Sequence, residues 1–154
     1  MSFDADLFLS TQVDAKLDTR RLPIPPGDYI AQITAIKGRE FESRKNPGEN
    51  MLVLSVTWQI DDANGAIKQA TGLENPTVVQ DVFIDRTPSG GLATGTGQNV
   101  QLGKLREAVG QNIPGQPWAP LMLVGTVARV AVVNEPDKNN PENVYDRVKS
   151  VAKA

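Results

Sequence analysis

Apolar and polar residues alternate along several stretches of this 154-residue chain, a pattern typical of half-buried β-strands. The clearest stretch covers residues 51–60, where every second residue is apolar and most of the residues between are polar. Side chains two residues apart lie on the same face of a strand, so the apolar set is expected to line the core. The predicted core positions of this strand are Leu52, Leu54, Val56, Trp58 and Ile60.

Four other stretches are also predicted to be strands. The first covers residues 28–37; its pattern allows an extension to residue 43, with a bend or bulge at Gly38. The third covers residues 77–85 and the fifth covers residues 143–151. The fourth, residues 121–133, is almost continuously apolar, which predicts burial on much of both faces.

One stretch, residues 96–110, has the spacing of an amphipathic helix. Asn99 is the expected N-cap, and Gly110 supplies the left-handed residue that ends many helices. Lys104 and Arg106 are expected to project away from the apolar stripe. The resulting order of strand, strand, strand, helix, strand, strand is that of the OB-fold, a mainly β, five-stranded Greek-key barrel, with one short helix between strands 3 and 4 that plugs an open end.

The chain is predicted to divide into an N-terminal arm, residues 1–22, and an OB-fold domain, residues 23–154. The arm mixes apolar and acidic residues without a sustained period, and it is expected to pack on the domain or on a neighbouring subunit, or else to form a poorly ordered tail. Pro23, Pro25 and Pro26 then restrict the chain to extended or turn geometry.

Charge is distributed unevenly along the chain. The net charge is -2, yet residues 1–18 alone carry -3, so the remainder is close to neutral at +1 and has room for a basic groove. The sequence has no cysteine and no histidine, which excludes disulfides, thiolate metal sites and the Ser-His and Cys-His arrangements of nucleophilic catalysis. No apolar run approaches the roughly 18 residues of a membrane span.

Other catalytic or metal-binding groups are weakly indicated. Asp61 and Asp62 lie in a turn where aspartate is favoured, and Asp81 and Asp85 lie on a strand and at its end. The glycine-rich residues 90–97 precede a helix but lack the lysine of a phosphate-binding loop, and a flexible loop is expected there. The chain is therefore expected not to be an enzyme and to use neither metal nor cofactor.

Basic and aromatic side chains, in contrast, occur together on the predicted strands. Proteins that bind single-stranded nucleic acid combine cations that follow the phosphates with rings on which the bases stack. For Phe41 and Tyr145 a core position is an equal alternative to stacking, whereas Trp58 is expected in the core. The candidate nucleic-acid-binding residues are Lys37, Arg39, Phe41, Arg44, Lys45, Arg86, Arg129, Tyr145, Arg147 and Lys149, of which the last two basic residues are expected to share one face of the fifth strand with the tyrosine.

Five segments stand out as motifs: Pro-x-Gly-Asp-Tyr at 25–29, Trp-Gln-Ile-Asp-Asp at 58–62, Leu-Gly-Lys-Leu-Arg-Glu-Ala-Val-Gly-Gln-Asn at 102–112, Pro-Gly-Gln-Pro-Trp at 114–118 and Tyr-Asp-Arg-Val-Lys-Ser-Val at 145–151. Together they resemble a family of small bacteriophage-encoded OB-fold single-stranded DNA-binding proteins. The resemblance covers roughly residues 23–152, and it implies a protein that coats single strands during phage DNA replication or recombination. Many such binders recruit partners through an acidic C-terminal tail, whereas the acidic segment here is N-terminal.

Two functions from different classes are therefore considered. The first is a sequence-tolerant single-stranded DNA-binding protein of the host-cell cytoplasm, which would form homo-oligomers through the arm and contact phage replication or recombination proteins but no membrane. The second is a phage virion structural or assembly protein that uses the barrel as an interaction module. An aromatic content of 5% and a small net charge favour the second, and the fold does not decide between them.

Overall fold

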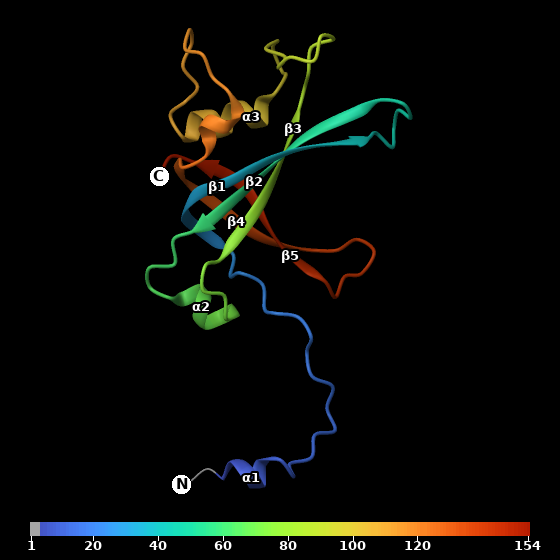
Figure 1. Cartoon of the computed structure of the whole chain (residues 1–154), viewed down its shortest axis with the longest axis vertical. Coiled ribbons are helices and arrows are strands. Elements are labelled where there is room, and N and C mark those ends of the chain that lie inside the picture. Colours follow the sequence, from blue (N-terminus) through green and yellow to red (C-terminus); the bar gives the residue numbers. More distant parts are fainter. Residues whose placement is uncertain (1–3) are drawn as a thin grey trace.

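Five antiparallel strands form one sheet in the computed structural model, which describes residues 4–154 (Figure 1). The order across the sheet is β3-β2-β1-β4-β5, so β3 and β5 are its two edges. These edges approach each other, but no backbone ladder joins them within the described residues, and the sheet stays open. The strands are β1 (Gly27–Glu42), β2 (Asn50–Ile60), β3 (Thr77–Ile84), β4 (Val127–Pro136) and β5 (Val144–Ala152).

The longest strand, β1, pairs with two neighbouring strands. Residues 27–32 pair with β4 and residues 31–42 pair with β2, which confirms the extension of this strand beyond residue 37. The register shifts between Ile33 and Ala35, where the Ile33 backbone bonds to residues 125 and 126 instead of to a strand. The bulge allowed at Gly38 is absent, because Gly38 pairs with Leu54 in unbroken register. The irregularity lies where β1 passes from one partner to the other.

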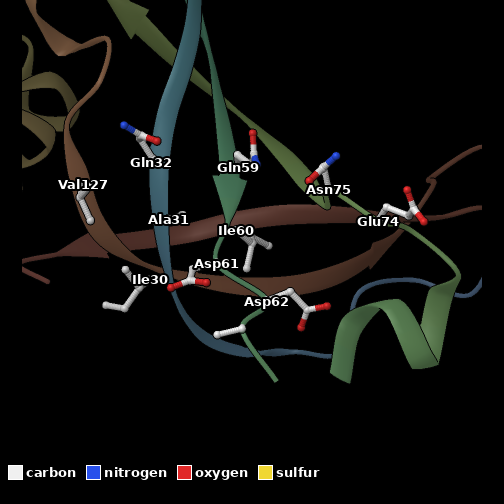
Figure 2. A pocket seen from close by; sticks show the side chains of 11 residues that line it. Ile30, Ala31, Gln32, Gln59, Ile60, Asp61, Asp62, Glu74, Asn75 and Val127 are labelled. Atoms are coloured by element: carbon white, nitrogen blue, oxygen red, sulfur yellow. The ribbon is translucent and has the colours of Figure 1, made fainter. Parts of the chain in front are cut away.

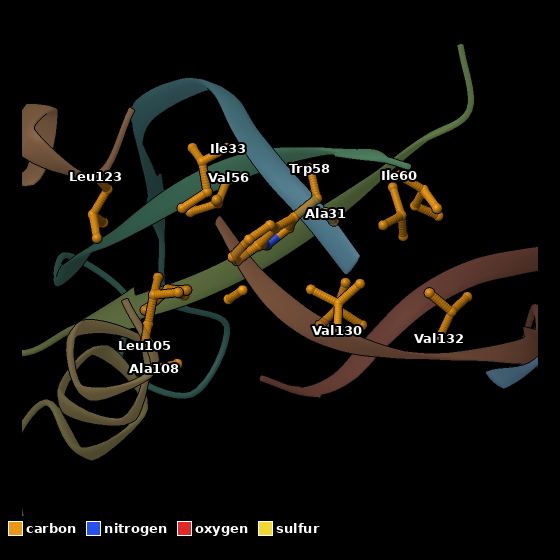
Figure 3. Close-up of a cluster of buried hydrophobic side chains, with 14 of the residues drawn as sticks. Ala31, Ile33, Val56, Trp58, Ile60, Leu105, Ala108, Leu123, Val130 and Val132 are labelled. Carbon is orange, nitrogen blue, oxygen red and sulfur yellow. The ribbon is translucent and has the colours of Figure 1, made fainter. Parts of the chain in front are cut away.

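The core lies between the inner face of the sheet and one helix, α3 (Val100–Ala108) (Figure 3). Trp58 of β2 is completely buried at its centre, as predicted, and its indole Nε1 donates a 3.0 Å hydrogen bond to Oε1 of Gln80. This bond satisfies two buried polar groups that would otherwise each be costly. The alternation predicted for β2 is confirmed: residues 54, 56, 58 and 60 are buried, and residue 52 is half-buried.

The fourth strand is shorter than predicted. It begins at Val127, because residues Pro120–Leu123 form a 3₁₀ turn, η1, and Gly125 separates this turn from the strand at a φ of +90°. Proline suits the first turn of a helix, and glycine readily adopts a positive φ. Buried and more exposed positions alternate along most of β4, so the prediction of burial on both faces is also wrong.

The predicted helix between β3 and β4 is confirmed as α3, and Gly110 follows it at a φ of +76°. The prediction that Arg106 projects away from the packed side is wrong. Its guanidinium carbon lies 4.2 Å from the centroid of the Trp118 ring, and Nη2 donates to the Gln111 carbonyl. The indole Nε1 of Trp118 donates in turn to Oε1 of Gln111 at 2.8 Å. This cluster attaches the irregular residues 111–119 to the end of the helix.

Two short helices were not predicted, namely α1 (Ala5–Phe8) in the arm and α2 (Ala66–Thr71) after β2. The Asp62 carboxylate accepts hydrogen bonds from the backbone of Ile67 at 3.0 Å and of Lys68 at 2.9 Å, at the start of α2. A helix of six residues is too short to show the periodicity of apolar residues that identifies a longer helix. Residues 1–3 of the predicted arm lie outside the described residues.

Candidate nucleic-acid interface

One side of β1, β2 and β3 carries most of the basic and aromatic candidates. Side chains on this side alternate with those that enter the core, and the register aligns Arg39 of β1 with Val53 of β2 and Phe83 of β3. The next aligned row consists of Lys37, Ser55 and Asp81. We call this surface the outer face, and its side chains include Lys37, Arg39, Phe41, Met51, Val53, Ser55, Val79, Asp81 and Phe83.

Two phenylalanine rings meet on the outer face. Phe41 of β1 and Phe83 of β3 are separated by β2, yet their ring centroids are 6.1 Å apart with the planes at 76°. Val53 lies between them on β2 and is only 1% exposed, whereas the two rings are 39% and 49% exposed. The rings therefore cover Val53 and still present aromatic surface to solvent. For Phe41 this excludes the core position that the sequence allowed.

Arg39, which lies in the same row as Phe83, is already paired with an acidic side chain. Arg39 donates from Nε to Oγ of Ser55 at 3.0 Å and is ion-paired through Nη2 with Oδ2 of Asp81 at 3.0 Å. Ser55 in turn donates to Oδ1 of Asp81 at 2.9 Å. The guanidinium is thereby oriented beside the rings, but its charge is largely neutralised. Exposed pairs of this kind stabilise the fold by only about 0–1 kcal/mol.

Basic side chains that form no ion pair within the described residues lie on the outer face and in the loop after β1. Lys37 is on the outer face, and Arg44 and Lys45 are in the loop between β1 and β2; all three are exposed, and none forms an ion pair with residues 4–154. The loop is shaped by hydrogen bonds, including one from the Ser43 backbone to the Glu49 carbonyl at 2.8 Å. Lys37 thus shares the face of the ring pair, and Arg44 and Lys45 lie in the loop that follows Phe41 at the end of β1.

Arg86 follows β3 and braces the β1–β2 hairpin. Its Nη1 is 3.0 Å from Oε1 of Glu40, its Nη2 donates to the Asn50 carbonyl at 3.2 Å, and its side chain is 30% exposed. Both terminal nitrogens of the guanidinium are therefore occupied by protein groups. We therefore assign Arg86 a structural role: it holds the hairpin against β3, and its guanidinium is less available to a phosphate than that of an unpaired arginine.

The glycine-rich segment between β3 and α3 is held by Asn99. Asn99 is the N-cap residue of α3, as predicted, but its side chain forms no capping hydrogen bond: its backbone is left-handed at a φ of 50°, and its side chain bonds to residues before the helix. Nδ2 donates to the carbonyls of Asp85 and Ala93, at 2.8 and 2.7 Å, and Oδ1 accepts from the Asp85 backbone at 2.7 Å. These bonds close a loop of residues 86–98 that the sequence indicated only as flexible.

The remaining candidates lie on the other half of the sheet. Tyr145 and Arg147 are two residues apart in the regular part of β5 and share one face, as predicted, whereas Lys149 falls at a register irregularity opposite residues 131 and 132. Arg147 is ion-paired with Glu135 at 2.5 Å, and exposed Arg129 lies on β4 without an ion-pair partner in the described part of the chain. In Figure 1 the β1–β2 and β4–β5 hairpins project to the same side of the view.

Tyr145 is 55% exposed, which excludes a core position for this ring. Its hydroxyl donates to Oδ2 of Asp137 at 3.1 Å, and this hydrogen bond raises the pKa of the tyrosine above its ordinary value. The pKa of Asp137 is lowered, first by a hydrogen bond from the Asn139 backbone and then by the one from Tyr145. The ring is thus held against the loop between β4 and β5.

Sequence reasoning missed two residues of the outer face, Phe83 and Asp81, as parts of an interface. The available signal was the alternation in β3, where Val78 and Val82 enter the core and the apolar Val79 and Phe83 alternate with them. Apolar residues on both faces of a strand indicate a second buried or binding surface. Their meeting with residues of β1 depends on register across β2, which no local pattern specifies.

A hollow of about 460 Å³ lies at the end of β2, between Gln32, Asp61 and Asn75 (Figure 2). Its other two carboxylates are already engaged, because Asp62 caps α2 and Glu74 is ion-paired with Lys68 at 3.3 Å. Among residues 4–154, no group of three or more aspartate, glutamate, histidine or cysteine side chains is arranged to hold a metal ion. The hollow therefore has no feature that indicates a catalytic or metal site.

Comparison with known proteins adds no assignment: the sequence matches no protein-family model, and no curated protein sequence matches it. None of the helices in residues 4–154 is long and apolar enough to cross a membrane.

Proposed function

We propose that this chain is a sequence-tolerant single-stranded DNA-binding protein. The single observation that carries the proposal is the exposed Phe41–Phe83 pair on the outer face, which also carries Lys37 and adjoins the loop that contains Arg44 and Lys45. Base stacking on an aromatic side chain contributes about 1–3 kcal/mol per base and is tolerant of sequence, because every base has a π-face. Flanking cations neutralise the phosphates, and together these two interactions support binding without base-specific contacts.

The strand arrangement is consistent with this role. The order β3-β2-β1-β4-β5, the helix between β3 and β4, and the approach of β3 to β5 fit a partly open Greek-key OB barrel. In that fold, oligonucleotides bind over strands 2 and 3 and between the loops that follow strands 1 and 4. Here those loops are residues 43–49, which contain Arg44 and Lys45, and residues 137–143, which precede Tyr145. Action in phage replication or recombination, in the host cytoplasm, rests on the resemblance of the sequence segments alone.

The charges limit the expected affinity. Asp81 compensates Arg39 and Glu40 compensates Arg86, which leaves Lys37, Arg44 and Lys45 as the main free cations of this side. Three neutralised phosphates give a salt dependence of about -2 for log affinity against log salt, since each contributes about -0.7 on a single strand. Binding should therefore be modest and sequence-tolerant.

The test is an anisotropy titration of the full chain with fluorescent oligothymidine and with a matched duplex, at about 50 and 200 mM salt. We expect preference for the single strand and a slope near -2. The triple variant Lys37→Gln/Arg44→Gln/Lys45→Gln should flatten the slope, whereas Lys153→Gln, near the C-terminus, serves as the control. Absence of binding at the lower salt concentration would exclude the proposal.

A virion structural or assembly role is the second candidate, and the arm is the observation that favours it. Leu7, Leu9 and Leu17 are 71%, 81% and 73% exposed, so the arm is available to clamp a neighbouring subunit. If DNA binding is absent and the chain is found in purified virions, this second function is the better description.

A further inference from the structure

We infer that a hollow beside the ring pair receives one base of the bound strand and selects a base that carries an exocyclic amino group. The hollow measures about 500 Å³ and lies where β2 begins and β3 ends. This inference rests on the proposed function and deepens it, because stacking on the rings treats all bases alike. We call this site the base hollow, and its lining includes Glu49, Asn50, Met51, Asp85, Arg86 and Gln98.

The base hollow adjoins the outer face. Met51 belongs to both, because it lines the hollow and is aligned with Phe41 in the register of β1 and β2. Ile84, another lining residue, directly follows Phe83 on β3. The two rings are thus direct neighbours of residues that line the hollow. A strand that stacks one base on the rings therefore brings a neighbouring base to the hollow.

Hydrogen bonds fix the walls of the base hollow. Arg86 joins its two sides, since Nη2 donates to the Asn50 carbonyl at 3.2 Å and Nη1 is paired with Glu40 at 3.0 Å. In the loop after β3, the Thr87 backbone donates to the Gly91 carbonyl at 2.7 Å, and Oγ1 of Thr87 accepts from the Gly91 backbone at 3.0 Å. Sites for small ligands are usually formed before the ligand binds. The bonds of Arg86 therefore shape a binding site as well as holding the hairpin.

The charges of the base hollow exclude a phosphate. The Glu49 carboxylate forms no ion pair and no hydrogen bond with residues 4–154, and Oδ2 of Asp85 accepts from the Asn99 backbone at 2.8 Å. Arg86, the cation in the lining, is already paired with Glu40. The lining therefore has an excess of negative charge, which repels the phosphates of a strand. The uncharged bases are the part of the strand that can enter.

The free polar groups of the base hollow complement a base with an amino group. Glutamate accepts from the N4 amino group of cytosine, and asparagine and glutamine bond to the N6 and N7 atoms of adenine. Besides Glu49, the side-chain amide of Asn50 and Nε2 of Gln98 form no hydrogen bond within the described chain; Oε1 of Gln98 accepts from the Gly95 backbone at 3.1 Å. Thymine and uracil present the O4 acceptor in place of an amino group, so they lack the donor that the carboxylate requires.

The test compares oligodeoxycytidine with oligodeoxyuridine of equal length in anisotropy titrations of the full chain. Their bases differ in one group, an N4 amino donor in cytosine and an O4 acceptor in uracil. We expect the wild type to bind oligodeoxycytidine about fivefold more tightly, which is the low end of the discrimination that a good base contact gives. The variant Glu49→Ala/Asn50→Ala should reduce this ratio towards one. Its affinity for oligodeoxyuridine should not fall, because the variant removes a negative charge.

The matched control is Glu74→Ala/Asn75→Ala, which removes the same two adjacent side chains from the hollow at the other end of β2. This control should keep the wild-type ratio. A ratio near one in the wild type, or a preference that persists in Glu49→Ala/Asn50→Ala, overturns the inference. If oligothymidine binds and the ratio is one, the base hollow fails alone. If no oligonucleotide binds, the proposed function fails with it.

Discussion

Arg39 and Asp81 are ion-paired at 3.0 Å although they belong to strands that are not neighbours. Strand β2 lies between them, and its Ser55 is hydrogen-bonded to both side chains. The pair places a carboxylate at the centre of the outer face, next to the phenylalanine rings. The face proposed to bind single strands therefore has one negative charge in its middle, and this charge is the first one to test.

The substitution Asp81→Asn should strengthen single-strand binding. It removes one negative charge and releases Arg39 to contact a phosphate, and a unit charge at about 4 Å in water corresponds to about 1 kcal/mol, or roughly fivefold in affinity. The measurement is the oligothymidine titration at low salt, with Asp61→Asn in the turn after β2 as the control. Weaker binding of Asp81→Asn would mean that the carboxylate is needed to orient the guanidinium.

Replacing Phe83 with alanine should weaken single-strand binding roughly fivefold or more, because one stacking ring contributes about 1–3 kcal/mol. Val79→Ala is the matched control, since Val79 is on the same face and is also 49% exposed but has no ring. Equal losses in the two variants would show that apolar area, and not stacking, is what the face supplies. Thermal unfolding measured alongside separates binding from the uncovering of Val53.

Removing the Asp146 carboxylate should destabilise the fold. Its nearly buried oxygens accept from Arg21, from the Ile24 backbone and from Nδ2 of Asn134, the last at 3.1 Å. The variant Asp146→Ala removes the acceptor shared by these three donors and leaves the partly buried Ile24 N–H without its side-chain partner, and we expect a loss of about 2–3 kcal/mol in urea unfolding.

Glu142→Ala provides the comparison for that measurement. Glu142 pairs with Arg20 on the same hairpin, but its side chain is 81% exposed, so its removal should cost under about 0.5 kcal/mol. Similar losses in the two variants would contradict the assignment of Asp146 as the main attachment of the arm.

Both tyrosines of the chain should ionise above the ordinary value of 10.0. The pKa of Tyr29 is raised by burial and then by Asp62 and Asp146, and that of Tyr145 by its hydrogen bond to Asp137. A pKa raised by folding contributes stability that is complete below pH 10 and is lost as the pH rises through the folded-state value. Tyrosinate absorbance during alkaline titration measures both groups.

The variant Tyr145→Phe assigns the second of those titrations. One of the two transitions should disappear, and the pKa of Asp137 should rise towards its usual range, because one of the hydrogen bonds that lower it is lost. The bond from the Asn139 backbone remains and should keep part of the shift. An unchanged Asp137 would show that the hydroxyl contributes nothing to that carboxylate.

Local pattern was sufficient for the five strands and the longest helix, but not for the short helices α1 and α2. The alternation in β2 predicted its buried face, including Trp58, and the spacing of apolar residues predicted α3 and its end at Gly110. It failed where local signals compete. The apolar residues 121–133 were predicted as one strand, although Pro120 and Gly125 divide them into a 3₁₀ turn and a strand.

The sequence by itself thus determined five strands, one principal helix and the residues that enter the core, because periodicity within a segment decides which side chains share a face. Only the tertiary structure determined which side chains from different strands meet on one face of the sheet. Register over β2 brought Phe41 to Phe83 and Arg39 to Asp81, and the meeting of the arm with β5 gave Asp146 its partners. These contacts join residues 42 to 125 positions apart, so no pattern within one segment specifies them.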